Sequence, residues 1–400
     1  MLRPYVDVLR TPGALPFSSA ALLARLPMSM FGLGIVLAVS AASGGYEQAG
    51  LVSGAALLGQ ASMAPVQARL ADRLGQGLML GPVLAAHGIS LGALILLVDR
   101  ASLPVLVAVA LLAGATLPSF GSLVRARWAR LHTGTPRLHT AYAFESVLDE
   151  FVFVVGPPLV TVLATSIDPR AGLAACLILT ISGGAVFAAQ RSSDPGPRRI
   201  ATTATSDGPP AFPVFTIAWV VVTFVFMGGI FGSIEVVTVA FADELGNRAS
   251  SGIVLAVFAL GSLLAGVIAG AVQWQASPRR RFVVGQLLMA LAVIPLPFVT
   301  SLPALAIAAF VAGFAISPTL IAGFSLVEAE VPAARLTEGL AWVSTALSAG
   351  VALGAVIAGP VIDRAGASTA FTVAVGCGFA ASAACVIGVT VEKRRQRETV

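Results

Sequence analysis

Three acidic residues lie inside a stretch of the chain that is long and apolar enough to span a bilayer. The stretch covers residues 137–165, and its first half contains Glu145, Asp149 and Glu150. A carboxylate near the middle of a membrane helix costs about 2.5–3.5 kcal/mol on insertion scales, so three of them need partners, water or a function. Glu145 and Asp149 are four residues apart, which places them on one face of a helix in successive turns. This acidic face is the first candidate for chemistry in the chain.

The acidic face leads to a predicted interruption of the same helix. Gly156 continues the stripe, and Pro157 and Pro158 follow it directly. Proline has no backbone N–H, and its ring clashes with the carbonyl one turn earlier, so two consecutive prolines disrupt the regular hydrogen-bond ladder. We therefore expect a helix break at Gly156-Pro157-Pro158, inside the hydrophobic segment.

Composition decides which class of protein must position these residues. The chain has 400 residues, of which 57% are hydrophobic and only 11% charged, and its mean hydropathy is +0.93. An ordinary soluble domain is about 25% charged, so this chain has too few charges to cover a soluble surface. The apolar runs are continuous rather than alternating, which indicates membrane-spanning helices and not a barrel. We expect an all-α integral membrane protein without cofactor or metal, because neither a nucleotide-binding loop nor a metal-ligand spacing occurs.

The apolar runs predict twelve spans, because about 20 helical residues cross the hydrocarbon core. They form an N-terminal six-helix bundle over residues 1–190 and a C-terminal six-helix bundle with a short basic tail over residues 212–400. Between them, residues 191–211 are rich in Pro, Ser, Thr and Arg, which is typical of a flexible linker. The expected spans cover residues 16–41, 47–68, 78–98, 103–125, 139–165, 171–190, 212–241, 249–273, 282–300, 303–327, 335–361 and 368–390.

The basic residues set the expected orientation. Of the 24 Lys and Arg residues, 19 fall in the N-terminus, the loops after even-numbered spans and the tail, among them Arg125, Arg127 and Arg130. By the positive-inside rule, both termini and the linker face the cytoplasm. The net charge of +5 is thus a topology signal, and we expect a multi-pass protein of the plasma or inner membrane without a nucleic-acid partner.

The two halves of the chain show an internal sequence similarity. A shift of 202 residues places Leu58-Gly59 on Leu260-Gly261, and a shift of 198 places Gly156 on Gly354. Two alignments with nearly the same offset, in matching spans, indicate a duplicated six-helix unit. Such repeats place a substrate site near the membrane midplane between the halves.

The loop after the second span carries a family signature. It reads PVQARLADRLGQ from Pro65, and it resembles the Gly-x-x-x-Asp-Arg-x-Gly loop of the major facilitator superfamily of secondary transporters. Asp72, Arg73 and Gly75 match, whereas Ala68 stands where Gly is usual. The resemblance implies twelve helices in two pseudo-symmetric bundles, and a cytoplasmic latch in which Asp72 and Arg73 form charge pairs in one state only. A solvated loop that merely sets topology is the alternative.

Two further spans bear on the subfamily of the superfamily that the chain resembles. Gly156-Pro157-Pro158 resembles the fifth-helix signature of its antiporters, which slightly favours export. Drug–proton antiporters carry an Arg in the fourth span, where this chain has Ala110. The fourth span therefore gives the drug-antiporter assignment no support.

Arg25 is the one basic residue inside a predicted span. The resemblance implies that the first and fifth helices are neighbours, so we expect Arg25 to pair with Glu145 or Asp149. The pair could be structural, because breaking it would strand a buried charge. It could instead switch, with a carboxylate that leaves Arg25 and takes a proton in one state. A snorkelling Arg25 is the third alternative.

Glu235 is an isolated acid in the seventh span, MGGIFGSIEVVTVAF. Gly228, Gly229 and Gly232 precede it, so the helix can bend there or let a neighbour approach closely. An acid in such a span usually faces an aqueous cavity. We expect substrate contact or protonation, and the alternative is an interhelical hydrogen bond of a protonated Glu235.

The sequence as a whole predicts a secondary active transporter of a small molecule, working by alternating access and driven by protons through Arg25, Glu145, Asp149 and Glu235. The acids hint at a cationic or polyhydroxy substrate, although they serve protons equally well. An uncoupled facilitator is the nearest alternative, and a receptor or scaffold is a further one. We expect no enzyme, since no clustered catalytic set occurs, and the expected partners are the substrate, protons and membrane lipid around a monomer.

Overall fold

Helices make up all the regular structure in the part of the chain that the computed structural model describes. The described residues are 3–132, 135, 137–197, 213–271, 274–332 and 336–398. Residues 198–211 of the predicted linker lie outside them, as does Arg335. The all-α fold that the apolar runs predict is confirmed.

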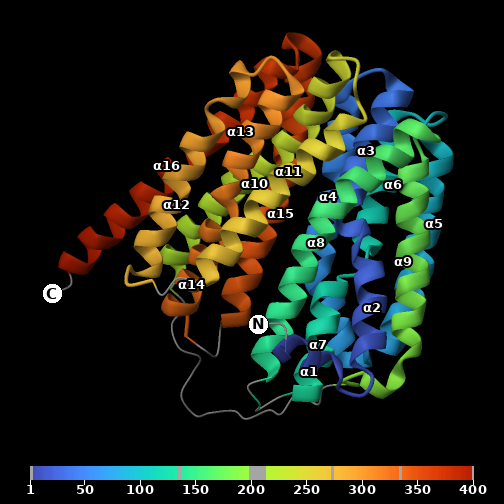
Figure 1. Cartoon of the computed structure of the whole chain (residues 1–400), viewed down its shortest axis with the longest axis vertical. Helices are drawn as coiled ribbons and strands as arrows, with labels where there is room; N and C mark the ends of the chain where they lie inside the picture. Colours follow the sequence, from blue (N-terminus) through green and yellow to red (C-terminus); the bar gives the residue numbers. More distant parts are fainter. Residues whose placement is uncertain are drawn as a thin grey trace. The chain divides into compact units, whose positions relative to one another are not determined.

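Figure 1 labels the helices in chain order. Those of the first half are α1 (Arg3–Leu9), α2 (Ala14–Arg25), α3 (Pro27–Ser43), α4 (Tyr46–Leu74), α5 (Gln76–Leu97), α6 (Leu103–Thr116), α7 (Phe120–His132), α8 (Arg137–Ser166), α9 (Ala171–Ala189) and the 3-10 turn η1 (Arg191–Ser193). Those of the second half are α10 (Val214–Glu244), α11 (Ser250–Ala271), α12 (Pro278–Val293), the 3-10 turn η2 (Leu296–Phe298), α13 (Leu302–Phe314), α14 (Ile316–Glu330), α15 (Leu336–Ala365) and α16 (Ala367–Glu398).

Twelve helical segments of the described residues are long and apolar enough to cross a membrane, which confirms the predicted number. Some spans consist of two helices in succession. The first, Ala14–Ser43, joins α2 to α3 at Leu26, where Pro27 begins the new helix. Proline is well placed at a first helical position, because the N–H that it lacks would have no partner there.

The fourth span, Leu103–His132, joins α6 to α7 and is longer than the sequence predicts. Pro118 interrupts it, and the side chain of Gln67 donates to the carbonyl oxygens of Ala115 at 2.9 Å and Leu117 at 3.3 Å. A side-chain amide therefore satisfies carbonyl groups that the interruption leaves without helical partners. The predicted end at residue 125 was too early, because Arg125, Arg127 and Arg130 belong to α7 and not to a loop.

The chain divides into two compact units. Unit 1 comprises Met1–Gly44 and Ala55–Thr202, and unit 2 comprises Gly45–Gly54 and Thr203–Val400. The first turns of α4 are thus grouped with unit 2. The boundaries that we expect for the bundles and linker, at residues 190 and 212, stay a prediction.

Equivalent glycines make equivalent contacts inside each unit. In unit 1, Gly59 of α4 lies against the backbone of Leu111 on α6, and in unit 2, Gly261 of α11 lies against the backbone of Phe310 on α13. Similarly, Gly156 of α8 lies against Ser29 on α3, and Gly354 of α15 against Gly229 on α10. A side chain at any of these glycines would collide with its neighbour, so the same residue type is needed twice. These contacts match the offsets of about 200 residues in the sequence.

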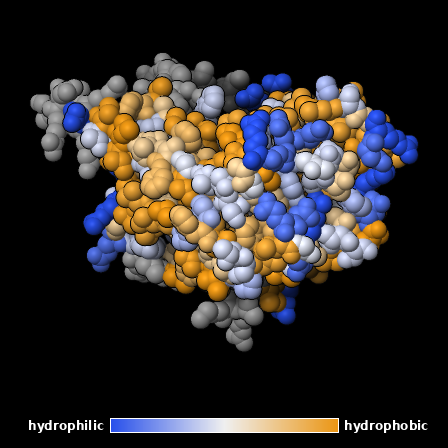
Figure 2. All heavy atoms as spheres, turned by 90° about the horizontal axis from the view of Figure 1, so that it is seen from above, coloured by the Kyte–Doolittle hydropathy of each residue, from blue (hydrophilic) through white to orange (hydrophobic). Residues whose placement is uncertain are grey.

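The outer surfaces of the spans carry large apolar side chains. Leu78 and Ile89 on α5, and Ile178 on α9, are exposed to the extent of 74%, 75% and 65%. Figure 2 shows apolar residues over much of the face that it presents, with hydrophilic residues gathered in separate patches. Surfaces of this kind suit contact with lipid hydrocarbon rather than water.

Candidate functional site

Arg25 pairs with both acids of the predicted stripe. Its guanidinium donates to an oxygen of Glu145 through one terminal nitrogen and to Oδ1 of Asp149, at 2.8 Å, through the other. Its Nε donates to the carbonyl of Ala21. The Arg25 side chain is buried, so the predicted pairing is confirmed and snorkelling is excluded.

Glu145 is fully enclosed by donors. Besides Arg25, the indole Nε1 of Trp128 donates to its Oε1 at 2.7 Å, and the hydroxyl of Ser18 donates to the same oxygen at 2.9 Å. None of the Glu145 side chain is exposed. Three donors, one of them charged, hold both oxygens of the Glu145 carboxylate in place.

Asp149 lies one helical turn further along α8 and is more open. Its Oδ2 accepts a hydrogen bond of 2.7 Å from Arg125 on α7, while Oδ1 accepts from Arg25. About a quarter of the Asp149 side chain (24%) and a third of the Arg125 side chain (33%) are exposed. We refer to Arg25, Arg125, Glu145 and Asp149 as the Arg25 cluster.

Aromatic packing holds the Arg25 cluster in place. Trp128 on α7 is fully buried and meets Phe17 of α2 edge-on, with the ring centroids 4.8 Å apart. On its other side it stacks on His132, which hydrogen-bonds to Thr11. Helices α2, α7 and α8 are thereby fixed around Glu145.

Sequence reasoning missed three members of this site: Ser18, Arg125 and Trp128. Arg125 was counted among loop residues, since a basic residue after an apolar run normally marks the end of a span. A helical continuation to His132 would have placed Arg125 and Trp128 three residues apart on one face. That spacing is the one signal that could have indicated them.

Glu235 has surroundings unlike those of the Arg25 cluster. It lies in the middle of α10 and is partly buried, and its carboxylate makes no hydrogen bond or ion pair with another described residue. On the same helix, Gly228 and Gly232 lie directly against the backbone of α15 at Leu347 and Val351. The close approach that these glycines predict is confirmed.

The predicted latch residues are placed at the end of α4. Asp72 and Arg73 are exposed and make no hydrogen bond or ion pair within the described residues. Gly75 has a φ of +86°, in the region that favours glycine, and it packs against Pro197 at 3.5 Å from where a Cβ would lie. The glycine thus has a conformational role in the turn from α4 to α5, while the latch role of Asp72 and Arg73 stays a prediction.

Asp194 anchors the chain after α9 to the start of α5. Its carboxylate accepts hydrogen bonds from the backbone N–H groups of Gln76 at 3.3 Å and Gly77 at 2.8 Å. Partial burial raises the pKa of Asp194, but the backbone donors of Gly196, Gly77 and Gln76 and the charge of Arg127 outweigh it, and the pKa is lowered overall. The anchor is therefore a carboxylate at a helix N-terminus, where negative charge is favoured.

Arg127 supports this anchor from inside the bundle. It is fully buried and donates to the side chains of Gln76 at 2.9 Å and Ser193 at 2.8 Å, and to the carbonyls of Phe187 and Gln190. Its guanidinium lies 3.6 Å above the ring of Phe187. A charge that finds so many acceptors can be buried, which is why the span continues past it.

The prolines of α8 do not end the helix. Helix α8 runs from Arg137 to Ser166 with Pro157 and Pro158 in its interior. The predicted break is therefore corrected to a continuous helix, in which the two prolines remove backbone N–H donors. Gly156 lies where a side chain would collide with Ser29 of α3, whose hydroxyl donates to the carbonyl of Val152.

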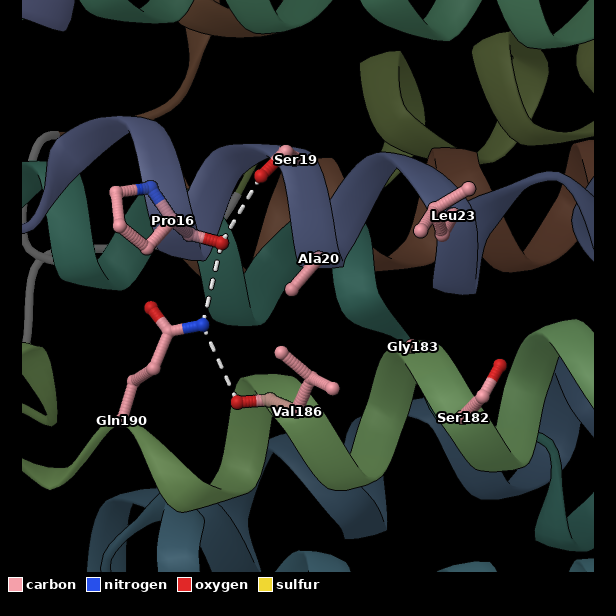
Figure 3. Close-up of a pocket in the computed structure, with 8 residues that line it drawn as sticks. All are labelled: Pro16, Ser19, Ala20, Leu23, Ser182, Gly183, Val186 and Gln190. Carbon is pink, nitrogen blue, oxygen red and sulfur yellow. Dashed lines mark hydrogen bonds between the residues drawn. The ribbon is translucent and has the colours of Figure 1, made fainter.

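A shallow groove of about 350 Å³ lies on the surface between α2 and α9 in unit 1. Figure 3 shows the amide nitrogen of Gln190 between the carbonyl oxygens of Pro16 and Val186, to which it donates at 3.1 and 3.2 Å. The groove lining contains no titratable side chain. The groove therefore lacks the charged groups that make up the Arg25 cluster.

The twelve apolar helical segments define a multi-pass membrane protein. A model of the Major Facilitator Superfamily matches residues 17–246 and 219–400. The chain belongs to this superfamily of secondary transporters. No curated protein matches the chain.

Solved structures of transporters share the fold. The nucleoside transporter NupG is 14% identical, with a TM-score of 0.70 over 94% of this chain and 99% of its own. The human organic anion transporter MFSD10 is 16% identical, with a TM-score of 0.65 over 92% and 98%. The POT family transporter PepTSo is 11% identical, with a TM-score of 0.72 over 94% and 97%. Similarity at this level of identity establishes the fold alone.

Proposed function

We propose that this chain moves a small molecule across the membrane in exchange or in company with protons, by alternating access of its two six-helix bundles. The observation that carries the proposal is the position of Asp149, a partly exposed carboxylate held only by the guanidinium groups of Arg25 and Arg125. A carboxylate inside a span marks a substrate or ion pathway in most membrane proteins. Its release from an arginine, with uptake of a proton, is a switch between two charge states.

The environments of the two acids divide the roles between them. Protonation of Glu145 would cost the hydrogen bonds of Trp128, Ser18 or Arg25 in a site closed to water. Protonation of Asp149 leaves Arg25 with Glu145 and leaves Arg125 partly exposed. We therefore assign proton coupling to Asp149 and a structural role to the pair of Arg25 and Glu145.

Glu235 is the second proposed coupling or substrate-contacting residue, because its carboxylate has no partner among the described residues. The resemblance of Gly156-Pro157-Pro158 to an antiporter signature favours export. Structurally similar proteins are transporters of nucleosides, organic anions and peptides by name, which agrees with a small-molecule substrate. A facilitator without ion coupling is the second candidate, and the same experiment separates the two.

Proton movement in proteoliposomes tests the proposal. The protein is reconstituted with a pH-sensitive dye inside the vesicles, and nucleosides, organic anions and small peptides are added on one side in turn. We expect at least one of these solutes to change the internal pH, and Asp149→Asn to abolish the change. Asp99→Asn is the matched control, because Asp99 forms an ion pair of 2.6 Å with Arg170 at a more exposed position in the same unit.

Solute flux without a change in internal pH would contradict proton coupling and make the chain a facilitator. If Asp149→Asn transports the solute and moves protons as the parent protein does, proton coupling stands but Asp149 does not carry it. Loss of coupling in both Asp149→Asn and Asp99→Asn would indicate a general effect on the fold. A loss confined to Asp149→Asn supports the proposed role.

A further inference from the structure

The Arg25 cluster is electrically balanced, with two guanidinium groups and two carboxylates on α2, α7 and α8. Within it the partners are unequally shared. Arg25 contacts both carboxylates and the carbonyl of Ala21, and it is almost completely buried. Arg125 contacts one carboxylate, that of Asp149, and the carbonyl of Gly121 at 3.1 Å. Among the described residues, Asp149 is thus the one carboxylate that compensates the charge of Arg125.

A proton on Asp149 would leave this charge without compensation. The neutral carboxyl no longer balances two arginines, while Arg25 keeps Glu145. Arg125 would then be a partly exposed guanidinium inside a membrane span, and the Arg25 cluster would carry a net charge of +1. An uncompensated charge in such a place is costly, so an anion from the aqueous side would bind there.

In the part of the chain that the structure describes, the other charged groups around Asp149 do not offer an alternative partner for Arg125. Helices α3 and α9, which pack against α8, carry no charged residue. On α1, Asp7 is exposed, and on α7, Arg127 is occupied by the groups at the start of α5 and the end of α9. His132 is stacked on Trp128, and Glu150 follows Asp149 with contacts of its own.

We propose that Arg125 binds an anionic substrate, of the carboxylate or phosphate class, that takes the place of Asp149 after Asp149 is protonated. This inference rests on the proposed function, because it requires Asp149 to accept the proton. One proton enters with a monovalent anion, and both leave together, so the net charge of the cluster stays at zero. Guanidinium suits this task, since its paired N–H groups match the two oxygens of a carboxylate or phosphate.

The inference reverses the substrate charge that the acids alone suggest. In the structure neither acid of the cluster is free to bind a cation, because Glu145 has three donors and Asp149 two arginines. Protonation of Asp149 releases a cation, the guanidinium of Arg125. A ligand that binds this group is therefore an anion. Symport of the anion with a proton would run inward, against the weak indication of export.

Ligand-dependent thermal stability of the purified protein tests this. The probes are acetate, benzoate and inorganic phosphate, with neutral benzamide and cationic choline for comparison, each at constant ionic strength and at pH 5 and pH 8. A ligand that binds the folded state raises the melting temperature in proportion to its occupancy. We expect the parent protein to be stabilised by at least one anion, and more strongly at pH 5.

Asp149→Asn mimics the protonated state and gives the sharpest comparison. At pH 8 we expect its apparent affinity for the anion to exceed that of the parent by about ten-fold or more, because the neutral amide does not compete with the anion for Arg125. Its affinity should also be equal at pH 5 and pH 8. The double variant Asp149→Asn with Arg125→Gln removes the freed cation and should lose the anion effect, and Arg125→Lys with Asp149→Asn should retain part of it.

Asp99→Asn is again the matched control, because it frees Arg170 outside the cluster. An equal gain of anion binding in Asp99→Asn would overturn the proposal, as would stabilisation of the parent by choline that Asp149→Asn removes. If Asp149→Asn does not fold, the pH dependence in the parent and its absence in Arg125→Gln decide the question. No anion effect at either pH in parent or variants overturns it as well.

The two proposals fail in different ways. Proton flux driven only by neutral or cationic solutes, with no anion binding, would leave proton coupling in place and remove the anion site. Anion binding that depends on Arg125 and Asp149, without any proton flux, would keep the site and remove the coupling.

Discussion

Glu145 and Asp149 are one helical turn apart on α8, yet their neighbours give them different chemistry. Glu145 is closed in by an indole, a hydroxyl and a guanidinium, and Asp149 lies at the open edge between two guanidinium groups. Two residues on the same face of a helix can thus have different environments. One turn, about 5.4 Å along the axis, is enough to change the depth of a side chain in the bundle. Glu235 in unit 2, which has no hydrogen-bond or ion-pair partner among the described residues, adds a third kind of environment.

At the scale of single residues, we predict that neutralising Glu145 lowers stability, whereas neutralising Glu235 affects transport and leaves stability nearly unchanged. Glu145→Gln leaves Arg25 buried with one carboxylate, and we expect a loss of about 3–5 kcal/mol in stability, because the uncompensated charge stays inside the protein. Glu235→Gln removes no contact with a described residue, and we expect its stability to change by less than about 0.5 kcal/mol while coupled transport is lost. Thermal unfolding in detergent and the proteoliposome assay measure the two effects.

Glu328→Gln is the control for the loss of an acid alone, since Glu328 is exposed and has no partner among the described residues. It should unfold at the temperature of the parent. A Glu145→Gln protein as stable as Glu328→Gln would show that the Arg25 pair contributes little to the fold. Full transport activity in Glu235→Gln would remove that residue from the mechanism.

The sequence predicts the core of the Arg25 cluster but not its full membership. A lone Arg in the first span and two acids in the fifth must find partners, and the energetic penalty for an isolated charge leaves few choices. Arg125 could not be found in this way, because the apolar run ends near it and an Arg there fits a loop equally well. Only the burial of Trp128 and Arg127 shows that α7 continues into the bundle.

At the scale of elements, the contact between Asp194 and the first turn of α5 joins residues that are 118 positions apart in the sequence. The carboxylate accepts from the first N–H groups of the helix and is supported by the buried Arg127 network. Residues in this part of the chain have a linker-like composition, which predicts no contacts of this kind. The folded part of the predicted linker therefore includes at least η1 and Asp194.

We predict that Asp194→Ala lowers stability by about 1 kcal/mol near neutral pH, the usual effect of losing an acceptor at a helix N-terminus. Because the pKa of Asp194 in the folded state is lowered from its ordinary value of 3.8, the stabilisation is present above that value. It is lost as the pH falls through the folded-state pKa. Melting temperatures of parent and variant between pH 7 and pH 3 should converge only at the acid end.

Asp168→Ala serves as a comparison, since Asp168 accepts from the backbone N–H of Arg170 in an exposed turn and does not contact α5. Its effect should be smaller than that of Asp194→Ala. A difference between parent and Asp194→Ala that persists undiminished at pH 3, or that is absent at pH 7, would contradict the proposed anchor.

The spans themselves were predictable, because hydropathy reports them directly, whereas interruptions within them were not. Pro118 ends α6 and is tolerated because Gln67 reaches the freed carbonyls, but Pro157 and Pro158 lie inside a continuous α8. The same residue type thus has two outcomes. Which one occurs depends on neighbours from other helices, and a single sequence does not specify these.

At the scale of the whole molecule, the distribution of basic residues predicts that both termini face the cytoplasm. We expect a tag after Val400 to be protected from protease in intact cells and to be digested once the membrane is permeabilised. A tag inserted at Asn247, in the turn after α10, should show the opposite behaviour, because that turn belongs to the opposite side. Digestion of the C-terminal tag in intact cells would reverse the predicted orientation.

The twofold repeat was also visible in the sequence, although its chemistry is not repeated. Equivalent glycines of the two halves make equivalent contacts, at Gly156 with Ser29 and at Gly354 with Gly229. At the matching offset, however, Glu145 and Asp149 correspond to Val343 and Leu347. The duplicated framework supports packing in both units, and the charges have been placed in one of them.

The balance of charge in the Arg25 cluster also determines how membrane voltage acts on it. Moving one elementary charge across a potential of 100 mV changes the free energy by about 2.3 kcal/mol. Two positive and two negative side chains that move together feel almost no net force, whether the site is empty or holds a proton with a monovalent anion. A transport cycle carried by this cluster would therefore respond to the pH gradient and be nearly indifferent to the electrical potential.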